Sequence, residues 1–254
     1  MLLPAQAATS TRADRAVVTR GLTKRFGRIT AVNDVALEVP RRCIYGFLGL
    51  NGAGKTTTIR MLLGLVRPTA GEVHVLGFPM PEKRRDVLLS VGAVVEQPTV
   101  YPHLTGFENL ELTRRLIGAA PASIPRALEI VDMATPARRL VREYSTGMRQ
   151  RLGIAIALLG SPELLILDEP TNGLDPVGIE AIRELIRGLP VRMNATVLVS
   201  SHILSEIEQI ADHVGILHEG RLALQGPLAP LRAGGKSLEQ IFFEVTRVRG
   251  GSPQ

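Results

Sequence analysis

The sequence predicts an α/β fold in which a mostly parallel sheet is interrupted by a helical insertion. Short β-rich apolar runs alternate with helical patterns along the 254 residues, which is typical of βαβ units. Two runs, at 164–168 and 196–202, are almost continuously apolar, as strands are when both faces of a parallel sheet are buried. From residue 98 to about residue 160 the pattern is helical only. These observations favour one large α/β domain that carries an inserted helical part.

Local patterns define the elements of the first half. A buried strand is expected at 43–49, and a helix at 56–66, where apolar residues recur at helical spacing. A second strand is expected at 91–96. Within the insertion, amphipathic helices are expected at 105–118 and 124–133.

The last third of the chain has its own pattern of elements. The run 203–214 has helical spacing, and 215–226 is expected to form two short strands around a Glu-Gly turn. A short helix is expected at 237–247. The apolar face of that helix consists of Leu238, Ile241 and Phe242.

Composition excludes several classes of protein. The single cysteine, Cys43, cannot form a disulfide framework, which favours a reducing cytoplasm; it lies in an apolar run and is expected to be buried. No apolar run reaches the roughly 18 residues of a membrane span, so the chain is not expected to cross a bilayer by itself. Residues 1–15 are too polar for a secretory signal and are expected to be a disordered lead-in. The net charge of +6 permits attraction to nucleic acid or to an anionic membrane but selects neither.

A phosphate-binding motif lies between the first predicted strand and its helix. Residues 49–56 match G-x-x-x-x-G-K-[ST]. The alternative is a chance glycine-rich turn, which is unfavoured because a strand precedes the motif and a helix follows it, as the motif requires. Gly52 and Gly54 let backbone N–H groups turn toward anionic oxygens, and the start of the helix adds its positive end. Lys55 supplies charge to the β- and γ-phosphates, the Thr56 hydroxyl can ligate Mg²⁺, and Thr57 can reach the α-phosphate. The sequence therefore predicts a nucleoside triphosphate site. Its residues are Gly49, Leu50, Asn51, Gly52, Ala53, Gly54, Lys55, Thr56 and Thr57.

Acidic residues follow one of the buried strands. Asp168 ends the strand 164–168, where ligands of open α/β sheets gather, and can hold the metal directly or through a water. Glu169 can polarise an attacking water. His202 ends the next strand and could report on the γ-phosphate by a hydrogen bond, although a lone histidine is more often structural. The alternative to these roles is that Asp168 and Glu169 are only solvated carboxylates at a strand end. This alternative is less favourable because a phosphate-binding loop requires a metal-binding carboxylate on a neighbouring strand.

The stretch 143–158, EYSTGMRQRLGIAIAL, permits two interpretations. It can be an ordinary helix start, with Ser145 or Thr146 as the cap. Arg149 and Arg151, however, have no charged partner within the first turn. Whether the stretch does more than start a helix therefore depends on what else the chain carries.

Together these motifs resemble the ATP-binding cassette (ABC) ATPases, the nucleotide-binding subunits of ABC transporters. The resemblance covers roughly residues 16–225, leaving 1–15 as a lead-in and 226–254 as a short C-terminal extension. It implies a RecA-like P-loop NTPase fold, with an antiparallel β portion and a helical subdomain inserted at about 98–160. It also implies ATP hydrolysis with ATP and Mg²⁺ as cofactors.

The resemblance assigns the stretch at 144–151 to the ABC signature, usually written LSGGQ. Two subunits of the family pair head to tail, and the signature of one contacts the γ-phosphate held by the other. Ser145, the Gly147 amide and the helix dipole would then face the partner's ATP, and the two arginines would need no local partner. Tyr144, Thr146 and Met148 depart from the consensus, and Thr146 adds bulk at a tight site.

Three further positions follow from the resemblance. Asp175 in TNGLDP corresponds to the D-loop at the dimer seam. Phe26 occupies the place of an aromatic that stacks on adenine, although a core phenylalanine is equally compatible with the sequence. Glu96, not Gln97, takes the glutamine position of the Q-loop, where it could reach the metal or a water. This variant and the C-terminal run SLEQIFFEVT resemble the bacitracin and lantibiotic export and immunity subgroup.

The expected function is that of an ATP-hydrolysing subunit that energises a separate integral membrane permease. The resemblance implies an exporter of peptide antibiotic, lipid-like or drug-like cargo, a homodimer of ATPase subunits, and a peripheral place on the cytoplasmic face of the membrane. A soluble ABC ATPase acting on DNA or ribosomes is the alternative. Such proteins carry long coiled coils or two cassettes, which this sequence lacks, so no nucleic acid partner is expected. The segment TVYPHLTGFENL, with Tyr101, Pro102, Leu104 and Phe107, could contact the permease or pack within the insertion.

Overall fold

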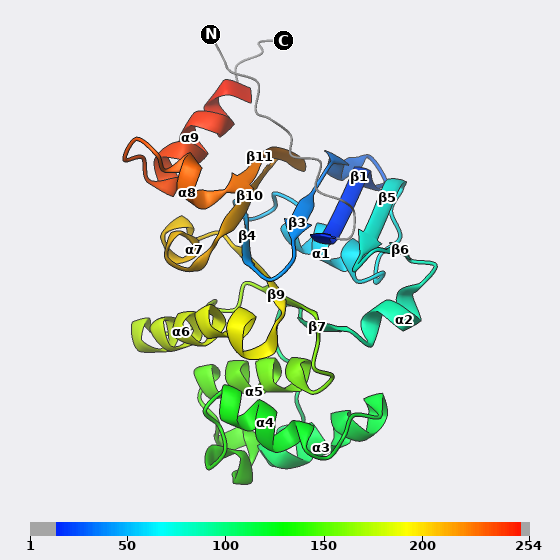
Figure 1. Cartoon of the computed structure of the whole chain (residues 1–254), viewed down its shortest axis with the longest axis vertical. Coiled ribbons are helices and arrows are strands. Elements are labelled where there is room, and N and C mark those ends of the chain that lie inside the picture. The colour runs from blue at the N-terminus through cyan, green and yellow to red at the C-terminus, as the bar shows by residue number, and fades with distance from the viewer. Residues whose placement is uncertain (1–13, 250–254) are drawn as a thin grey trace.

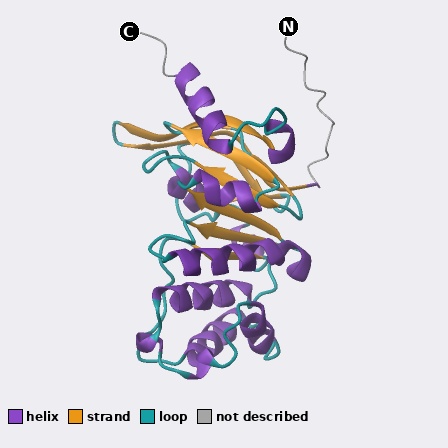
Figure 2. Cartoon of the chain, turned by 90° about the vertical axis from the view of Figure 1, so that its left-hand side faces the viewer, coloured by secondary structure: helices purple, strands orange, loops and turns teal. Residues whose placement is uncertain are grey.

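The computed structural model describes residues 14–249, in which two β-sheets lie beside a group of helices (Figures 1 and 2). The larger sheet has the strand order β11-β10-β4-β9-β8-β7. Its strands are β4 (Ile44–Leu48), β7 (Val91–Val94), β8 (Leu164–Asp168), β9 (Thr196–Ser201), β10 (His213–His218) and β11 (Arg221–Pro227). In the smaller, antiparallel sheet, β3 pairs with β1 beside the path β2-β1-β5-β6. Its strands are β1 (Arg15–Phe26), β2 (Ile29–Val35), β3 (Glu38–Pro40), β5 (Ala70–Val75) and β6 (Phe78–Met80).

The strands from β10 to β7 are parallel and form the core of the larger sheet. Every residue of β4, β8 and β9 is buried, as their continuous apolar runs predict. Parallel strands bring their carboxyl ends to one edge of a sheet, where ligands of open α/β sheets bind. Gly49, Glu169 and His202 each come directly after one of these three strands and therefore lie at this edge.

The hairpin of β10 and β11 confirms the predicted strand pair around a Glu-Gly turn. Glu219 and Gly220 have φ of 47° and 74°, and the left-handed conformation at both residues matches a type I′ turn. The predicted helix 203–214 is wrong at its end, because α7 spans only Leu204–Ile210. His213 and Val214 instead pair with β4 in the parallel sheet, so strand pairing overrides the helical spacing.

The helical subdomain lies at one end of the molecule, at the bottom of Figure 2. It contains α3 (Gly106–Ile117), α4 (Ser123–Ile130), α5 (Thr146–Leu158) and the 3₁₀ turns η2 (Pro136–Arg138) and η3 (Val141–Glu143). Thr105 and Glu108 form a reciprocal capping box at the start of α3, and Gly118 ends that helix in the left-handed conformation. These local signals explain why the first predicted helix of the insertion forms. The second, predicted at 124–133, begins at Ser123 and ends at Ile130.

The turn that precedes α3 is hydrogen bonded to the segment that precedes α5. The Val141 amide donates to the Leu104 carbonyl at 2.9 Å, and the Arg142 amide donates to the Pro102 carbonyl at 3.0 Å. An isolated β-bridge joins Thr105 to Leu140. The two segments, about 40 residues apart in the sequence, are therefore one backbone unit.

The remaining helices differ from the predictions in length and number. They are α1 (Lys55–Leu62), α2 (Arg84–Leu88), α6 (Pro176–Met193), α8 (Leu228–Leu231) and α9 (Leu238–Arg249). Helix α1 ends four residues before the predicted end at 66, since Gly64 adopts φ of 63°. Strand β7 ends at Val94 rather than at residue 96, where Glu96 has φ of 62°. Within residues 14–249, no helix combines the length and the hydrophobicity that crossing a membrane requires.

The C-terminal helix α9 is present as predicted. Leu238, Ile241 and Phe242 are buried and belong to the same hydrophobic cluster as one face of the larger sheet. At the other end of the chain, β1 starts at Arg15, and residues 1–13 of the expected lead-in lie outside the described residues.

Cys43 is buried just before β4, as predicted. Its Sγ lies 3.3 Å from the Pro40 carbonyl oxygen. Burial, together with the nearby charge of Asp212, raises the pKa of the thiol to about 12. The thiol therefore stays protonated near neutral pH and behaves as a small apolar side chain.

Candidate functional site

The phosphate-binding loop joins β4 to α1 and packs closely against two other segments. Gly54 has φ of 102°, and a Cβ there would lie 2.4 Å from the Ala31 carbonyl oxygen of β2. A Cβ on Gly49 would lie 2.5 Å from the Leu217 carbonyl oxygen of β10. Gly52, with φ of 81°, faces open space. The glycines thus permit close packing at the base of the loop and leave its tip open to a ligand.

Lys55, Glu169 and His202 form one connected chain of polar contacts. The Lys55 Nζ donates to the Gly49 carbonyl at 2.7 Å and lies 3.0 Å from the Glu169 Oε1. The Glu169 Oε2 lies 2.6 Å from the His202 Nδ1. The Lys55 side chain is only 6% exposed, so its charge is held inside the loop by oxygen atoms. The structure thus brings together the three residues that the sequence predicted as catalytic.

Asp168 is held at the end of β8 by the neighbouring strand. The Ser200 hydroxyl of β9 donates to the Asp168 Oδ1 at 2.5 Å and accepts the Glu169 amide at 2.9 Å. Glu169 has φ of 51°, an uncommon conformation for a non-glycine residue. Ser200 therefore fixes two consecutive acidic residues, and strained backbone of this kind is frequent at functional sites.

A cleft of about 750 Å³ lies beside these carboxylates. The three residues predicted to hold the metal, Thr56, Asp168 and Glu96, all line it. A hydroxyl and carboxylates are hard oxygen donors, which fit Mg²⁺. Gln97 lines the same cleft, so both candidates for the Q-loop position are present there. Glu96 forms an ion pair with Arg60, with 2.6 Å between the Arg60 Nη2 and the Glu96 Oε1.

Three other predicted residues line a second cleft of about 530 Å³. Ser145, Gly147 and Asp175 border it, whereas no residue of the phosphate-binding loop does. Ser145 caps α5 through its hydroxyl, which accepts the Met148 amide at 3.2 Å, and Asp175 caps α6 in the same way. One chain thus carries the two parts of the predicted site in different clefts, and Thr146, which lies between Ser145 and Gly147, lines both.

Comparison with known proteins agrees with this geometry. The ABC transporter family model matches residues 32–172, more than half of the chain. The chain belongs to the ABC transporter family. It is similar to the bacitracin transport ATP-binding protein of Bacillus licheniformis, with 50% identity over 85% of this chain and 71% of that protein. A lantibiotic transport ATP-binding protein of Streptococcus pyogenes is 40% identical over 88% of this chain and 94% of that protein.

A solved ABC structure resembles the chain as well. A dimeric ATP-binding cassette in a post-hydrolysis state, with ADP and phosphate bound, superposes with a TM-score of 0.74 at 25% identity. The match covers 84% of this chain and 98% of that one. The predicted fold and subgroup are confirmed: the chain is the nucleotide-binding ATPase subunit of an ABC transporter. The alternative of a soluble ABC ATPase acting on DNA or ribosomes is not supported. ABC subunits of this kind dimerise and work with membrane permease components.

The segment predicted to be the ABC signature is built around Tyr144. Tyr144 is buried, and its hydroxyl donates to the Pro136 carbonyl at 2.8 Å. A Cβ on Gly106 would lie 2.3 Å from that hydroxyl, so the residue at the start of α3 must be small. Burial raises the pKa of Tyr144 above its usual value. The departure from the consensus leucine thus supplies a hydrogen bond within the helical subdomain.

The two signature arginines have local partners, contrary to the expectation from the sequence. The Arg149 Nη1 donates to the Tyr144 carbonyl at 2.6 Å. The Arg151 Nη1 donates to the Val131 carbonyl at 3.1 Å and lies 3.6 Å from the Asp132 Oδ2. The Tyr144 carbonyl lies in the same stretch as Arg149, whereas Val131 and Asp132 lie about 20 residues before Arg151 and are brought to α5 by the fold.

Phe26 is not a core residue, because 51% of it is exposed. It ends β1 at the hairpin with β2, the strand that packs against the phosphate-binding loop at Ala31 and Gly54. The Lys24 ammonium lies 4.9 Å from the centre of its ring. An exposed aromatic face beside the loop is compatible with stacking on a base.

Sequence reasoning missed Ser200 and Arg60. Ser200 is fully buried and contacts both Asp168 and Glu169. A serine in an otherwise apolar buried strand indicates a polar contact, because a buried hydroxyl needs a partner. Arg60 offers no comparable indication, since arginine is common on helix surfaces.

Proposed function

We propose that the chain powers the export of a peptide antibiotic, or of another lipid-like or drug-like molecule, through a separate membrane permease. The observation that carries this proposal is the 50% identity with a bacitracin transport ATP-binding protein over 85% of the chain. The lantibiotic transport relative supports the same class of cargo. The subunit acts peripherally at the cytoplasmic face of the membrane. ATP is available there, and the reducing cytoplasm suits its single buried thiol.

Drug susceptibility tests the proposed cargo. A susceptible bacterium that produces the chain with its permease should tolerate more bacitracin or lantibiotic than one producing the Lys55→Ala subunit. The variant keeps the permease and removes only the charge that binds phosphate. Equal susceptibility of the two strains to bacitracin, to a lantibiotic and to an anthracycline, with both subunits in the membrane, would reject the proposal.

Within the site, the chain binds ATP through the phosphate-binding loop and activates water through Glu169. Thr56, Asp168 and Glu96 would hold Mg²⁺, which neutralises charge between the β- and γ-phosphates when it is bound. Phosphate oxygens offer Lys55 new partners, so the Glu169 carboxylate becomes available to accept a proton from water. His202, in contact with the other oxygen of Glu169, keeps that carboxylate oriented.

A second copy of the chain completes the site. Ser145, Gly147 and Asp175 lie in a cleft separate from the phosphate-binding loop of their own chain, so they act on the ATP of a partner. Two apolar side chains are exposed on the corresponding surfaces: Leu50 on the loop at 55% and Val177 beside the second cleft at 78%. Head-to-tail pairing of two chains would cover both surfaces.

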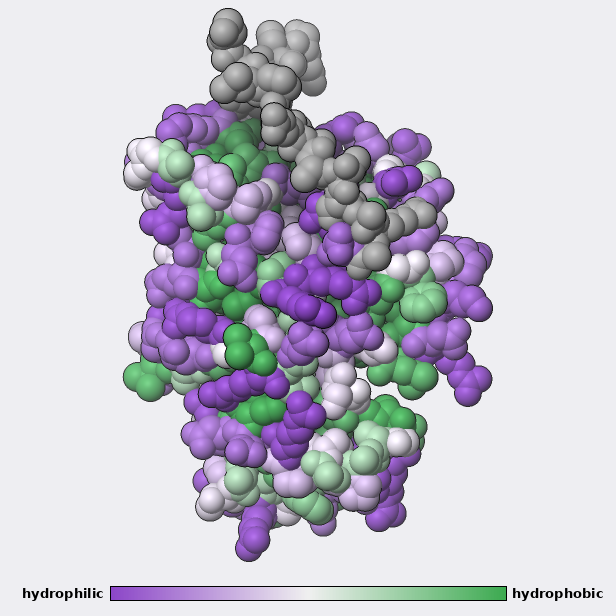
Figure 3. Space-filling model, viewed as in Figure 1, coloured by the Kyte–Doolittle hydropathy of each residue, from purple (hydrophilic) through white to green (hydrophobic). Residues whose placement is uncertain are grey.

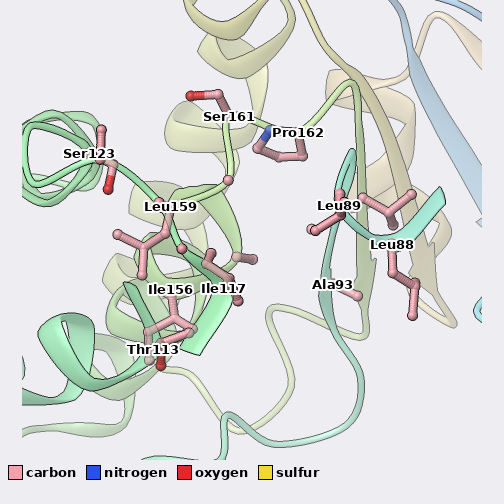
Figure 4. Close-up of a pocket in the computed structure, with 17 residues that line it drawn as sticks. Leu88, Leu89, Ala93, Thr113, Ile117, Ser123, Ile156, Leu159, Ser161 and Pro162 are labelled. Carbon is pink, nitrogen blue, oxygen red and sulfur yellow. The ribbon is translucent and has the colours of Figure 1, made fainter. Parts of the chain in front are cut away.

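A groove of about 500 Å³ is the proposed contact site for the permease (Figure 4). One wall carries Leu88 and Leu89, and the other carries Ile117, Ile156 and Leu159, as Figure 4 shows. In the view of Figure 3, apolar surface is visible on the right, where the helical subdomain meets the rest of the chain. An apolar segment of the permease fits a groove of this chemistry.

The segment after the Q-loop, which does not line this groove, is a second proposed contact for the permease. Tyr101 and Phe107 are 50% and 48% exposed, so they do not merely pack within the insertion. Pro102 is also exposed, and Leu104 is half-buried. A permease segment that lies in the groove could contact this turn, which follows Glu96 by a few residues.

Cysteine cross-linking tests the docking surface. In a Cys43→Ser background, cysteines at positions 89, 101 and 104 should form cross-links with cytoplasmic loops of the permease. A cysteine at position 191 is the control, because Val191 is 90% exposed on α6 and does not line the groove. Cross-linking from position 191 alone, in an assembled transporter, would contradict the proposed surface.

A further inference from the structure

Arg60 and Thr56 lie on the same face of α1, one turn apart. Residues four positions apart on an α-helix are neighbours, with their Cβ atoms roughly 6 Å from each other. Thr56 lines the cleft with the metal-site carboxylates, and Arg60 makes its ion pair with Glu96, which lines the same cleft. Glu96 therefore has two cationic partners within reach along one helix face: the metal beside Thr56 and the guanidinium of Arg60.

The ion pair holds Glu96 in a conformation that a free loop would not favour. Glu96 has φ of 62°, in the left-handed region that non-glycine residues seldom adopt. Among residues 14–249, the contact with the Arg60 Nη2 at 2.6 Å is the one ion pair that Glu96 forms. The Glu96 and Arg60 side chains are 62% and 41% exposed, so water screens the attraction and the pair can open readily.

The negative charge of Glu96 allows it to bind either of the two cations. A carboxylate is attracted both to a guanidinium and to a divalent cation, whereas a neutral glutamine at this position would bind either one weakly. One carboxylate that exchanges between two cations makes the conformation of the loop depend on whether the metal is present.

We propose that Arg60 is a positioning residue that holds the Glu96 carboxylate away from the metal until ATP and Mg²⁺ bind. Arg60 and the metal then compete for the same carboxylate, which moves by about one helical turn between them. This inference rests on the proposed role of Glu96 as a metal ligand, and it adds a resting partner that the P-loop helix itself supplies. The Q-loop is thereby linked to α1 in the absence of metal and to the nucleotide in its presence.

Metal binding, measured apart from turnover, tests the proposal. The full chain is loaded with a non-hydrolysable ATP analogue, and binding of Mn²⁺ in place of Mg²⁺ is followed by electron paramagnetic resonance. Arg60→Gln should tighten Mn²⁺ binding about two- to fivefold, the range expected for release of an exposed ion pair. Glu96→Gln should weaken it, and adding Arg60→Gln to that variant should change nothing further. Arg60→Lys keeps a cation and should stay close to the wild type.

The outcomes separate the two proposals. An unchanged Mn²⁺ affinity in Glu96→Gln would reject the metal role of Glu96 on which the inference rests. If Glu96→Gln weakens binding but Arg60→Gln has the same effect in both backgrounds, the competition is refuted and the metal role stands. A drop in affinity for the metal-free nucleotide in Arg60→Gln would place Arg60 in nucleotide binding and overturn its assignment as a positioning residue.

Discussion

The Glu169 carboxylate joins Lys55 to His202, with 3.0 Å between Oε1 and the lysine Nζ and 2.6 Å between Oε2 and the imidazole Nδ1. One carboxylate thus contacts the cation that binds phosphate and the histidine at the end of the next strand. In the proposed mechanism ATP and Glu169 share Lys55, and hydrolysis requires the carboxylate to leave the lysine.

Replacing Glu169 by glutamine tests its role as the base. The amide keeps the size of the side chain but cannot accept a proton from water, so turnover should fall by at least about 100-fold. ATP binding should persist, because the loop and Lys55 are unchanged, and an ATP-bound dimer should accumulate. ATPase assays and size-exclusion chromatography with ATP measure both effects. Turnover near the wild-type rate would exclude Glu169 as the general base.

Position 96 should matter more than position 97. Glu96→Ala removes a carboxylate from the metal side of the cleft and also the partner of Arg60. The permease-stimulated ATPase rate of the assembled transporter should therefore fall more than nucleotide affinity does. Gln97→Ala, which removes an exposed side chain of the same cleft, is the matched control and should be milder. The reverse order of effects would assign the Q-loop role to Gln97.

Gly147→Asp distinguishes a helix cap from a shared site. Gly147 lies in the first turn of α5, and a Cβ there would meet no atom closer than 3.9 Å. An acidic residue is favourable in this turn, so the free energy of unfolding of the monomer should be unchanged or higher by up to about 1 kcal/mol. ATP-driven dimerisation and hydrolysis should be lost, because the aspartate would face the partner's γ-phosphate.

Mixing two inactive subunits extends that test. A dimer of Lys55→Ala with Gly147→Asp has one site with both lesions and one with neither. Partial hydrolysis by the mixture, absent from each variant alone, is the expected result. A mixture that pairs, stays folded and remains inactive would count against a site shared between chains, unless both sites must work together.

His213 should make the protein less stable in mild acid. Burial lowers the pKa of His213 below its usual 6.5; Asp212 raises that pKa and Arg15 lowers it. The unfolded chain then binds a proton more readily than the folded one, so the free energy of unfolding falls as pH drops through about 6.5. Urea denaturation at about pH 7.5 and pH 5.5 measures this decrease, which should be smaller in His213→Gln. An equal decrease in both proteins would assign it to other groups.

The sequence predicts the strands of the core more accurately than the helices around it. The run at 164–168 forms β8 with the expected bounds, because a continuous apolar run leaves little choice of register. Helix α6 was missed, since Gly188 and Pro190 interrupt its apolar pattern although both lie inside the helix. The end of α7 was misplaced because residues after it pair with a strand about 170 positions earlier, which local spacing cannot report.

In the candidate site, too, local features could be predicted from the sequence and long-range contacts could not. Lys55, Asp168 and Glu169 could be predicted, since they follow buried strands in recognisable motifs. The contacts of Ser200 with Asp168 and of Arg60 with Glu96 could not, because each joins segments more than 30 residues apart. Local sequence therefore specifies which groups carry the chemistry, and the tertiary fold decides what holds them.

The hydrogen-bonded unit of residues 102–105 and 140–142 has a consequence for a dimer of such chains. Its first part belongs to the turn that we propose contacts the permease, and its second part leads within three residues to Ser145. A displacement of the outer turn would therefore be passed to the start of α5, which in the proposed dimer faces the nucleotide of the opposite chain rather than its own. In the assembled transporter, each half of the permease would then control hydrolysis of the ATP bound to the ATPase chain that it does not contact. In a heterodimer, suppose that only one chain has an altered docking turn. ATP bound to the phosphate-binding loop of the unaltered chain should then be hydrolysed slowly, and ATP bound to the loop of the altered chain should be hydrolysed normally.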